Sequence, residues 1–183
     1  DSMWPFREMF RHAQKVIVYN LANEGATLAA GLTALESYQF NIIVTDSVEE
    51  SDVTAVVSKV KSWRDGMGKK CQAVVYNHSV EGDLNTIATN NVASKCVVAS
   101  GDSLHTESAL VYWVAGALAG CAVNKSCTNM AYDGELTVDV AYTQSELQAA
   151  IDAGKIVFHL VYGEVRMLED VNSLTKPGTD QTE

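Results

Sequence analysis

Most of the interpretation depends on the stretch ESALVYWVAGALAGCAVNKS, residues Glu107–Ser126. Its middle, Ala109–Val123, holds fifteen consecutive residues without a charge. This run is too short for a membrane span, which needs roughly 20 apolar residues. It predicts instead a buried helix about 22 Å long, apolar on all sides. Its alanines and glycines would let a neighbouring backbone approach closely, which offsets the roughly 1 kcal/mol that each interior glycine costs a helix.

Upstream of this run, short Val- and Ile-rich segments alternate with helical patterns. The segments typical of buried strands are KVIVYNL (Lys15–Leu21), FNIIVTD (Phe40–Asp46), CQAVVYN (Cys71–Asn77) and KCVVAS (Lys95–Ser100). Between them, Thr27–Ser37 and Ser51–Gly66 carry apolar residues at three- and four-residue steps, as amphipathic helices do. This alternation predicts an α/β fold with a largely parallel or mixed sheet flanked by helices.

Downstream, the pattern predicts a strand, a helix and a β-hairpin. ELTVDVA (Glu135–Ala141) alternates like a half-exposed strand. Thr143 and Glu146 form a capping-box pair in front of a helix that stops at Gly154. The following residues, 155–170, predict two strands around a turn at Tyr162 and Gly163.

These patterns divide the chain into three parts. We expect an α/β core domain over residues 1–130 and a strand, helix and hairpin portion over residues 131–171, packed on the core or continuous with it. The last residues, 172–183, are polar and carry Pro177 and Gly178, so they predict a flexible tail.

Composition restricts the classes of function. The chain has 183 residues and 47% apolar content, enough for a sizeable core. Its 23 acidic residues against 13 basic ones disfavour a nucleic-acid surface, because phosphate binding needs a basic field. Nothing near the N-terminus has the layout of a signal peptide. We therefore expect a globular protein with no nucleic-acid partner and no membrane partner.

The cysteines and histidines do not have metal-ligand spacing. Four cysteines, Cys71, Cys96, Cys121 and Cys127, include no C-x-x-C pair and lie mostly in apolar runs. This is typical of reduced, buried thiols in a protein made inside a cell. We expect no metal site.

A catalytic alternative needs testing. Asp46 ends one predicted strand, His78 follows another, and Ser108 begins the apolar helix, in the chain order of subtilisin-class serine hydrolases. However, the serine lies in GDSLHTESAL, without the glycine-bounded turn and oxyanion donors that a nucleophile needs. We expect no catalytic residue, and a serine hydrolase using Asp46, His78 and Ser108 is the alternative.

Cofactor binding is also weakly supported. GMGKK (Gly66–Lys70) lies between a helix and a strand, whereas a phosphate loop lies between a strand and the helix after it. The strand-to-helix junctions lack the G-x-G-x-x-G pattern of nucleotide-binding domains. We expect no cofactor.

Several stretches together resemble the tail sheath proteins of contractile-tailed bacteriophages and of phage-like bacteriocins. They are FREMFRHAQKVIVYNL, ALESYQFNIIVTD, GKKCQAVVYN, VAGALAGCAVNKSCTN, AYDGELTVDV and IDAGKIVFHLVYGEVRMLEDVNSLT, and they span nearly the whole chain in family order. The resemblance implies a subtilisin-like α/β domain without protease activity, which agrees with the Asp, His, Ser order.

The resemblance also implies a role. Sheath subunits form hexameric rings stacked helically around a tail tube, and they contract to drive the tube through the host envelope. The implied partners are other copies of the chain, the tube protein, and the baseplate and tail terminator proteins. The implied location is the virion tail, after assembly in the cytoplasm of a bacterial host. Terminal arms in this family add strands to the sheets of neighbouring subunits.

Two departures from the family pattern concern its other domains. NLANEGATLAAG runs from a predicted strand directly to a helix, where the family has a β-rich insertion, and the chain ends at Glu183 without the C-terminal arm domain. We expect both to be absent from this chain. The basic residues Arg7, Arg11 and Lys15, and Lys69 with Lys70, are candidates for contacts with acidic surfaces of neighbouring subunits.

Overall fold

The computed structural model describes residues 3–22, 24–77 and 86–175. The helices in these residues are α1 (Trp4–Phe10), α2 (Leu28–Leu35), α3 (Glu50–Met67), α5 (Leu110–Gly120) and α6 (Gln144–Asp152), with a 3-10 turn η1 (Glu107–Ala109) before α5. The strands are β1 (Ile42–Val44), β2 (Gln72–Tyr76), β3 (Thr89–Val92), β4 (Lys155–Ile156), β5 (Phe158–Val161) and β6 (Glu164–Met167).

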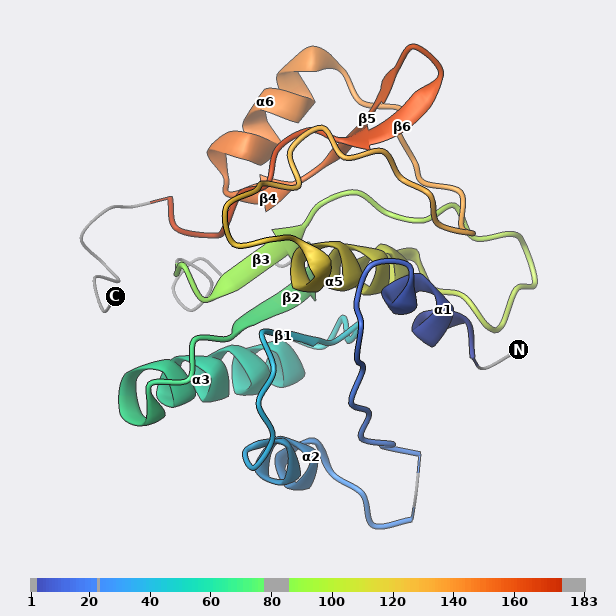
Figure 1. Ribbon diagram of the computed structural model, residues 1–183. Coiled ribbons are helices and arrows are strands. Elements are labelled where there is room, and N and C mark those ends of the chain that lie inside the picture. The colour runs from blue at the N-terminus through green and yellow to red at the C-terminus, as the bar shows by residue number, and fades with distance from the viewer. Residues whose placement is uncertain (1–2, 23, 78–85, 176–183) are drawn as a thin grey trace.

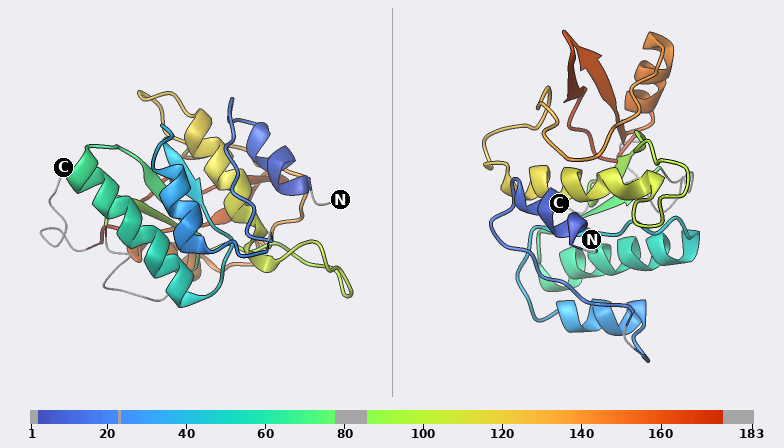
Figure 2. Two further views of the ribbon diagram at one scale, coloured as in Figure 1. Left: turned by 90° about the horizontal axis from the view of Figure 1, so that it is seen from below. Right: turned by 90° about the vertical axis from the view of Figure 1, so that its right-hand side faces the viewer.

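Within the described residues, the first four strands form one parallel sheet in the order β1-β2-β3-β4. Strands β5 and β6 form a separate antiparallel pair. Helices α3 and α5 lie on opposite faces of the parallel sheet (Figure 1 and Figure 2). The predicted fold class, an α/β protein with a largely parallel sheet and a C-terminal hairpin, is confirmed.

The alternation of side chains along β2 divides the core into two clusters. Ala73 and Val75 face the cluster beneath α3, whereas Val74 faces the cluster beneath α5. The predicted apolar face of α3 is buried at three- and four-residue steps, through Val53, Val56, Val57, Val60 and Trp63. The helix ends at Met67, one residue beyond the predicted end, and its C-cap Gly68 adopts the left-handed conformation.

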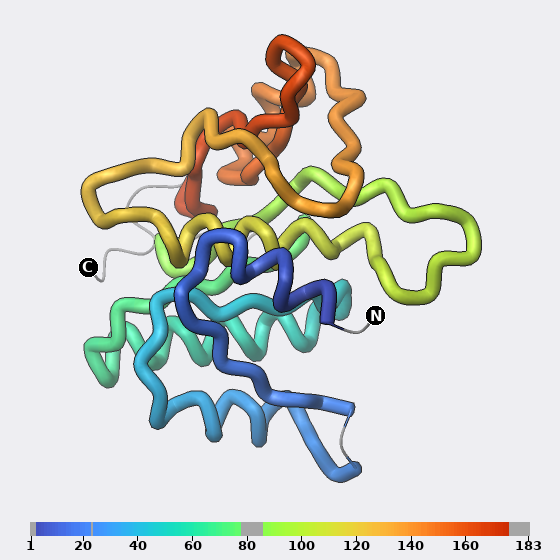
Figure 3. The backbone as a smooth tube through the Cα atoms, turned by 45° about the vertical axis from the view of Figure 1, so that its right-hand side comes forward, coloured from blue at the N-terminus to red at the C-terminus, as the bar shows by residue number. Residues whose placement is uncertain are grey.

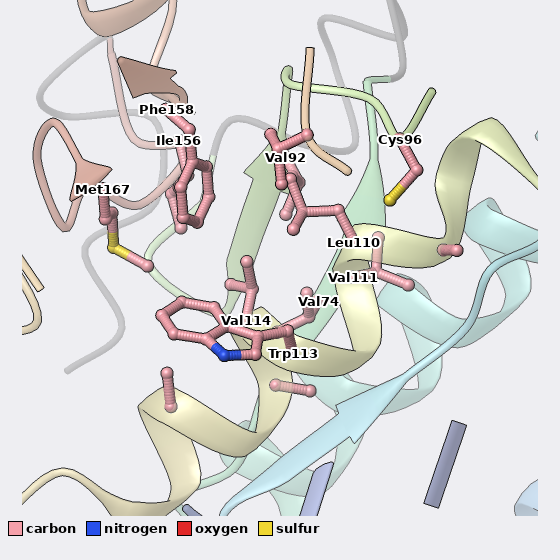
Figure 4. Close-up of a cluster of buried hydrophobic side chains, with 14 of the residues drawn as sticks. Val74, Val92, Cys96, Leu110, Val111, Trp113, Val114, Ile156, Phe158 and Met167 are labelled. Atoms are coloured by element: carbon pink, nitrogen blue, oxygen red, sulfur yellow. The ribbon is translucent and has the colours of Figure 1, made fainter. Parts of the chain in front are cut away.

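The cluster on the α5 side is built around Trp113. Its indole packs edge-on against Phe158 at 5.6 Å between ring centroids, and Val92, Ile156 and Met167 complete the buried wall (Figure 4). Each fully buried side chain of this size contributes roughly 1.5–3 kcal/mol to folding. This cluster therefore fastens the hairpin β5–β6 and the sheet to α5.

Two predicted strands are wrong. Lys15–Leu21 has no strand partner among the described residues and runs as irregular chain from the α5 layer to α2 (Figure 2). Val18 and Leu21 are exposed in this segment, whereas Val16 and Ile17 are half-buried. In Lys95–Ser100, only Cys96 makes a bridge, to Val138. The third strand of the sheet is instead Thr89–Val92. This segment lacks the apolar pattern of a buried strand because it contains two asparagines.

Other boundaries differ in part. Glu135–Ala141 is not a strand, since its one bridge is at Val138. Helix α5 ends at Gly120 rather than near Val123, because Cys121 is extended.

The C-terminal signals are confirmed. Thr143 and Glu146 form the capping box of α6. Tyr162 and Gly163 have positive φ values of 49° and 88°, as the turn of a two-residue hairpin requires.

The three predicted parts, 1–130, 131–171 and 172–183, stay a prediction. Strand β4 from the second part joins β3 of the first. At the start of the predicted tail, the backbone N–H of Ser173 donates to the carbonyl of Thr89 at 2.9 Å. Residues 176–183 lie outside the described residues.

Candidate functional site

Of the three candidate catalytic residues, Ser108 has the clearest surroundings. It lies in η1 and is buried, and its hydroxyl donates to the backbone carbonyl of Asp46 at 2.9 Å. The Thr106 hydroxyl is the second partner, also at 2.9 Å. Among the described residues, the partners of the Ser108 hydroxyl are thus a carbonyl and a hydroxyl, neither of which is a general base. His78 lies outside the described residues.

The Asp46 carboxylate has a different neighbour. Burial raises the pKa of the Tyr112 hydroxyl, and the charge of Asp46 and a hydrogen bond to it raise that pKa further. Since Asp46 follows β1 and Tyr112 lies on α5, the Asp46 and Ser108 contacts together fix the start of α5 to the end of the sheet. The structure therefore brings Asp46 and Ser108 together as packing and hydrogen-bonding partners.

An Asp–His pair lies elsewhere, on the loop before η1. His105 Nδ1 contacts Asp102 Oδ2 at 2.5 Å, and this hydrogen bond lowers the pKa of Asp102. The His105 ring packs on Trp4, whose indole N–H donates to the carbonyl of Leu104 at 3.1 Å. This loop projects from the body of the molecule (Figure 3). The Asp102–His105 pair and its contacts with Trp4 fix the base of the loop to α1.

Helix α1 crosses α5 at the two helix glycines. A Cβ atom on Gly116 would lie 2.5 Å from the carbonyl oxygen of Met9, and one on Gly120 would lie 2.3 Å from that of His12. Neither distance is possible for a real side chain, so both glycines are required by the approach of the α1 backbone. The predicted close packing of a neighbouring backbone on the apolar helix is confirmed, and α1 is that neighbour.

The other side of α1 is held by polar contacts to residues 132–135. The buried Glu8 carboxylate accepts from the Glu135 backbone N–H at 2.9 Å and from the Tyr132 hydroxyl at 3.4 Å. Arg7 pairs with the Glu135 side chain at 3.0 Å. We call α1, with these contacts and its packing on α5, the α1 clasp.

A shared carboxylate completes the α1 clasp. Asp133 Oδ1 accepts from the Trp113 indole at 2.7 Å and contacts His12 Nε2 at 3.1 Å. Burial raises the pKa of Asp133, but the hydrogen bonds from Trp113 and His12 outweigh it and leave the pKa below its usual value. The hydrogen bond from Arg7 lowers the pKa of Glu135.

The basic residues proposed for contacts between subunits are partly used inside the chain. Arg7 and Arg11 both pair with Glu135. Lys69 is buried, with its ammonium 4.3 Å from the Phe40 ring centroid and 3.2 Å from the carbonyl of Glu36. The hypothesis of a surface patch formed by Lys69 and Lys70 is therefore corrected, because Lys69 stabilises the packing between α2 and α3 and only Lys70 is exposed.

A groove runs along the open edge of β1. It has a volume of about 650 Å³, and its lining includes Val16, Val18, Leu21, Leu32, Ile42 and Val44. In a parallel ladder, alternate residues bond to the same neighbour. Since Asn41 and Thr45 bond to β2, the backbone groups of Ile42 and Val44 point away from it. In the part of the chain that the structure describes, no strand pairs with this edge of β1. We call this feature the β1 groove.

Metal-binding clusters and membrane spans are two other kinds of feature that would point to a function. In residues 3–22, 24–77 and 86–175, no three His, Cys, Asp or Glu side chains are grouped so that they could hold one metal ion. None of the described helices is long and apolar enough to cross a bilayer.

Comparison with known proteins identifies the family. Residues 22–173 match the family model for the phage tail sheath protein central domain. The chain belongs to the phage tail sheath family. The crystal structure of a sheath tail protein from Desulfitobacterium hafniense superposes with a TM-score of 0.72 at 30% identity, over 86% of this chain and 38% of that one. The sheath tail protein from Listeria innocua gives 0.69 at 28% identity, over 81% of this chain and 34% of that one.

Curated relatives agree with this assignment. YqbK of Bacillus subtilis, which is uncharacterised, is 31% identical over 82% of this chain, and the protein XkdK of the phage-like element PBSX is 30% identical over 78%. The tail sheath protein of Clostridium phage phiCD119 is 26% identical over 88% of this chain. This sheath chain spans 32% and 30% of the lengths of the first two relatives and 43% of the third.

The α1 clasp was not among the sequence predictions for this sheath domain. Pro5 in the first turn of α1 is a helix-start signal that could have located the helix. The partners of α1 could not be found in this way, because the Arg7–Glu135 contact joins residues 128 positions apart.

Proposed function

We propose that this chain is the central domain of a contractile tail sheath subunit. Subunits polymerise as stacked hexameric rings around a tail tube, and the sheath contracts to drive the tube through the host envelope. The observation that carries the proposal is the match of residues 22–173 to the sheath central domain, supported by the similarity to two solved sheath structures. The role is structural, and no enzymatic step is part of it.

The contacts inside the chain support a rigid unit. The α1 clasp joins the first helix to α5 and to residues 132–135, and the Asp46 and Ser108 contacts join α5 to β1. A sheath that changes length needs subunits that move against each other, so rigid domains with alternative interfaces suit this task. The alternative, a serine hydrolase, is disfavoured because the Ser108 hydroxyl is buried and hydrogen-bonded to a carbonyl.

The proposed partners are other copies of the subunit, the tail tube protein, and the baseplate and tail terminator proteins. The proposed location is the tail of a phage or phage-like particle assembled in a bacterial cytoplasm. A subtilisin-like core without protease activity belongs to the same proposal.

We assign one contact between subunits to the β1 groove, with a second copy of the subunit as its occupant. Among the described residues, no strand pairs with the outward-facing backbone groups of Ile42 and Val44 there, and Val18 and Leu21 expose apolar side chains. An extended segment of a neighbouring copy would satisfy the backbone groups and cover the apolar surface.

Immunogold labelling of particles tests the main proposal. Antibodies raised against the purified chain should label tails along their whole length in negative-stain images, and the labelled layer should shorten and thicken in contracted tails. Pre-immune serum is the control. Label confined to the capsid or to one end of the tail, or tails without label, would contradict the proposal.

A further inference from the structure

The loop after α5 brings two cysteines together. Helix α5 ends at Gly120, and the backbone N–H of Lys125 donates to the carbonyl of Ala122 at 2.8 Å, which closes a turn. This turn reverses the chain between Cys121 and Cys127. The two cysteines therefore lie on the two arms of one short loop, and both are free thiols.

Both thiol groups lie near the end of α5, each beside a backbone carbonyl. Cys121 Sγ lies 3.4 Å from the carbonyl of Lys125, and Cys127 Sγ lies 3.6 Å from the carbonyl of Ala117. Since Ala117 lies one helical turn before Cys121, Cys127 Sγ packs against the turn of α5 that leads into Cys121. The other described cysteines, Cys71 and Cys96, are buried in two different core clusters.

One of the two thiols is accessible to a small molecule. A polar cavity of about 300 Å³ opens beside Cys121, lined by Gln72, Asn90, Lys125, Asp170 and Asn172 among others. Cys121 is partly exposed, whereas Cys127 is 1% exposed. A reagent that enters this cavity would meet Cys121 first.

We propose that Cys121 and Cys127 form an intramolecular disulfide when the folded chain meets a low-molecular-weight disulfide such as oxidised glutathione. The Cys121 thiol loses its proton to solvent, and the thiolate attacks one sulfur of glutathione disulfide, releasing one glutathione thiolate. Cys127 then loses its proton and attacks the Cys121 sulfur, which releases the second glutathione. Two protein thiols are oxidised and one glutathione disulfide is reduced to two thiols, so atoms and electrons balance.

The second step sets the rate and its dependence on pH. Burial, together with the smaller effect of the nearby Cys121 thiol, raises the pKa of Cys127 to about 12. Its thiolate fraction below that value grows tenfold for each rise of one pH unit. Closure should therefore be about ten times faster at pH 9 than at pH 8.

The disulfide would join the end of α5 covalently to Cys127 and Thr128, which contact Asp170. The backbone N–H of Cys127 already donates to Asp170 Oδ2 at 3.0 Å, and Asp170 N–H donates to Thr128 Oγ1 at 3.0 Å. The exposed residues 122–126 between the cysteines would then form a covalently closed loop. This chemistry does not depend on the assembly proposed above.

Peptide mapping of the full chain tests the proposal. The folded chain is incubated with oxidised glutathione, alkylated and digested with trypsin without reductant. Cleavage after Lys125 separates the two cysteines, so the disulfide should appear as a linked pair of peptides that a reductant separates. The linked pair should be lost in Cys121→Ser and Cys127→Ser and kept in Cys71→Ser and Cys96→Ser, with circular dichroism confirming that each variant is folded.

Two results would overturn the proposal. One is that oxidised glutathione forms disulfides in the urea-unfolded chain but leaves Cys121 and Cys127 of the folded chain reduced, so that both are fully alkylated. The other is loss of the linked pair in Cys96→Ser, which would assign the bond to Cys96 because the tryptic peptide with Cys121 also contains Cys96.

Discussion

Gly116 and Gly120 set the distance between the backbones of α1 and α5. We expect Gly116→Ala to destabilise the protein by about 1–3 kcal/mol, because the new methyl group would lie 2.5 Å from the Met9 carbonyl oxygen and would force α1 outward. Gly66→Ala is the matched control, since Gly66 lies in α3 and no neighbouring group lies within 4 Å of the position that the new methyl group would take. It should be neutral or stabilise by up to roughly 1 kcal/mol.

Urea unfolding at equilibrium measures both free energies. Equal effects of the two substitutions would contradict the assignment, because helix propensity alone favours alanine at both positions.

The carboxylates of the α1 clasp make its stability dependent on pH. Asp133 and Glu135 have lowered pKa values in the folded protein. The unfolded chain therefore binds protons first as the pH falls, so the stabilisation is present above about pH 4 and is lost below it. The free energy of unfolding should fall between pH 6 and pH 3.

A double variant isolates this contribution, since Asp102 and Glu146 also have lowered pKa values. In Asp133→Asn with Glu135→Gln, the fall in the free energy of unfolding over the same pH range should be smaller than in the parent. Urea titrations at pH 6, 5, 4 and 3 measure the difference. Parallel curves for parent and variant would show that other groups carry the dependence.

At the level of elements, the α6 capping box is a local signal with a measurable value. The Thr143 side chain accepts from the Glu146 N–H, and the Glu146 side chain accepts from the Thr143 N–H at 2.7 Å. Thr143→Ala should cost about 0.5–2 kcal/mol. Thr33→Ala in α2 is the control, since its hydroxyl donates to the Ala29 carbonyl within the helix and should be close to neutral. Thermal unfolding that shifts equally in both variants would contradict a capping role.

The elements that sequence could predict are those with local signals. The apolar stripe and Gly68 cap of α3, the capping box of α6 and the turn at Tyr162 and Gly163 each depend on residues a few positions apart. Strand β3 could not be predicted, because Asn90 and Asn91 are polar and their burial depends on the strands that pair with β3 on both sides. Lys15–Leu21 has strand-forming residues but no described partner strand.

The candidate site shows the same limit. The chain order of Asp46 and Ser108 suggested a proximity that the structure has, but the contact is made by the Asp46 backbone carbonyl. The small residues of α5 predicted a closely packed neighbour, while the identity of α1 depends on contacts across more than a hundred positions. The sequence pattern therefore shows that α5 is closely packed, but it does not show which element packs on it.

The whole molecule combines a closed interior with an open sheet edge. Helices cover both faces of the parallel sheet, and β4 is followed directly by the hairpin. At the opposite edge, the β1 groove leaves backbone groups and apolar side chains without cover in the described residues. A protein that polymerises needs such a surface, and an open edge is where a strand from another copy binds with least rearrangement.

Substitution in the β1 groove tests this role in assembled particles. Val18→Glu places a charge at a groove residue that is 54% exposed, and Val97→Glu places the same charge on the loop between β3 and η1, at a residue that is 58% exposed. Neither change should affect folding by more than about 0.5 kcal/mol, because both are surface positions. In cells where each variant is the sole source of the subunit, Val18→Glu should lower the number of sheathed tails at least tenfold in negative-stain images, because a buried unpaired carboxylate destabilises the contact. Val97→Glu should leave that number near the parent level. Sheathed tails in parental numbers with Val18→Glu would place the contact between subunits on another surface.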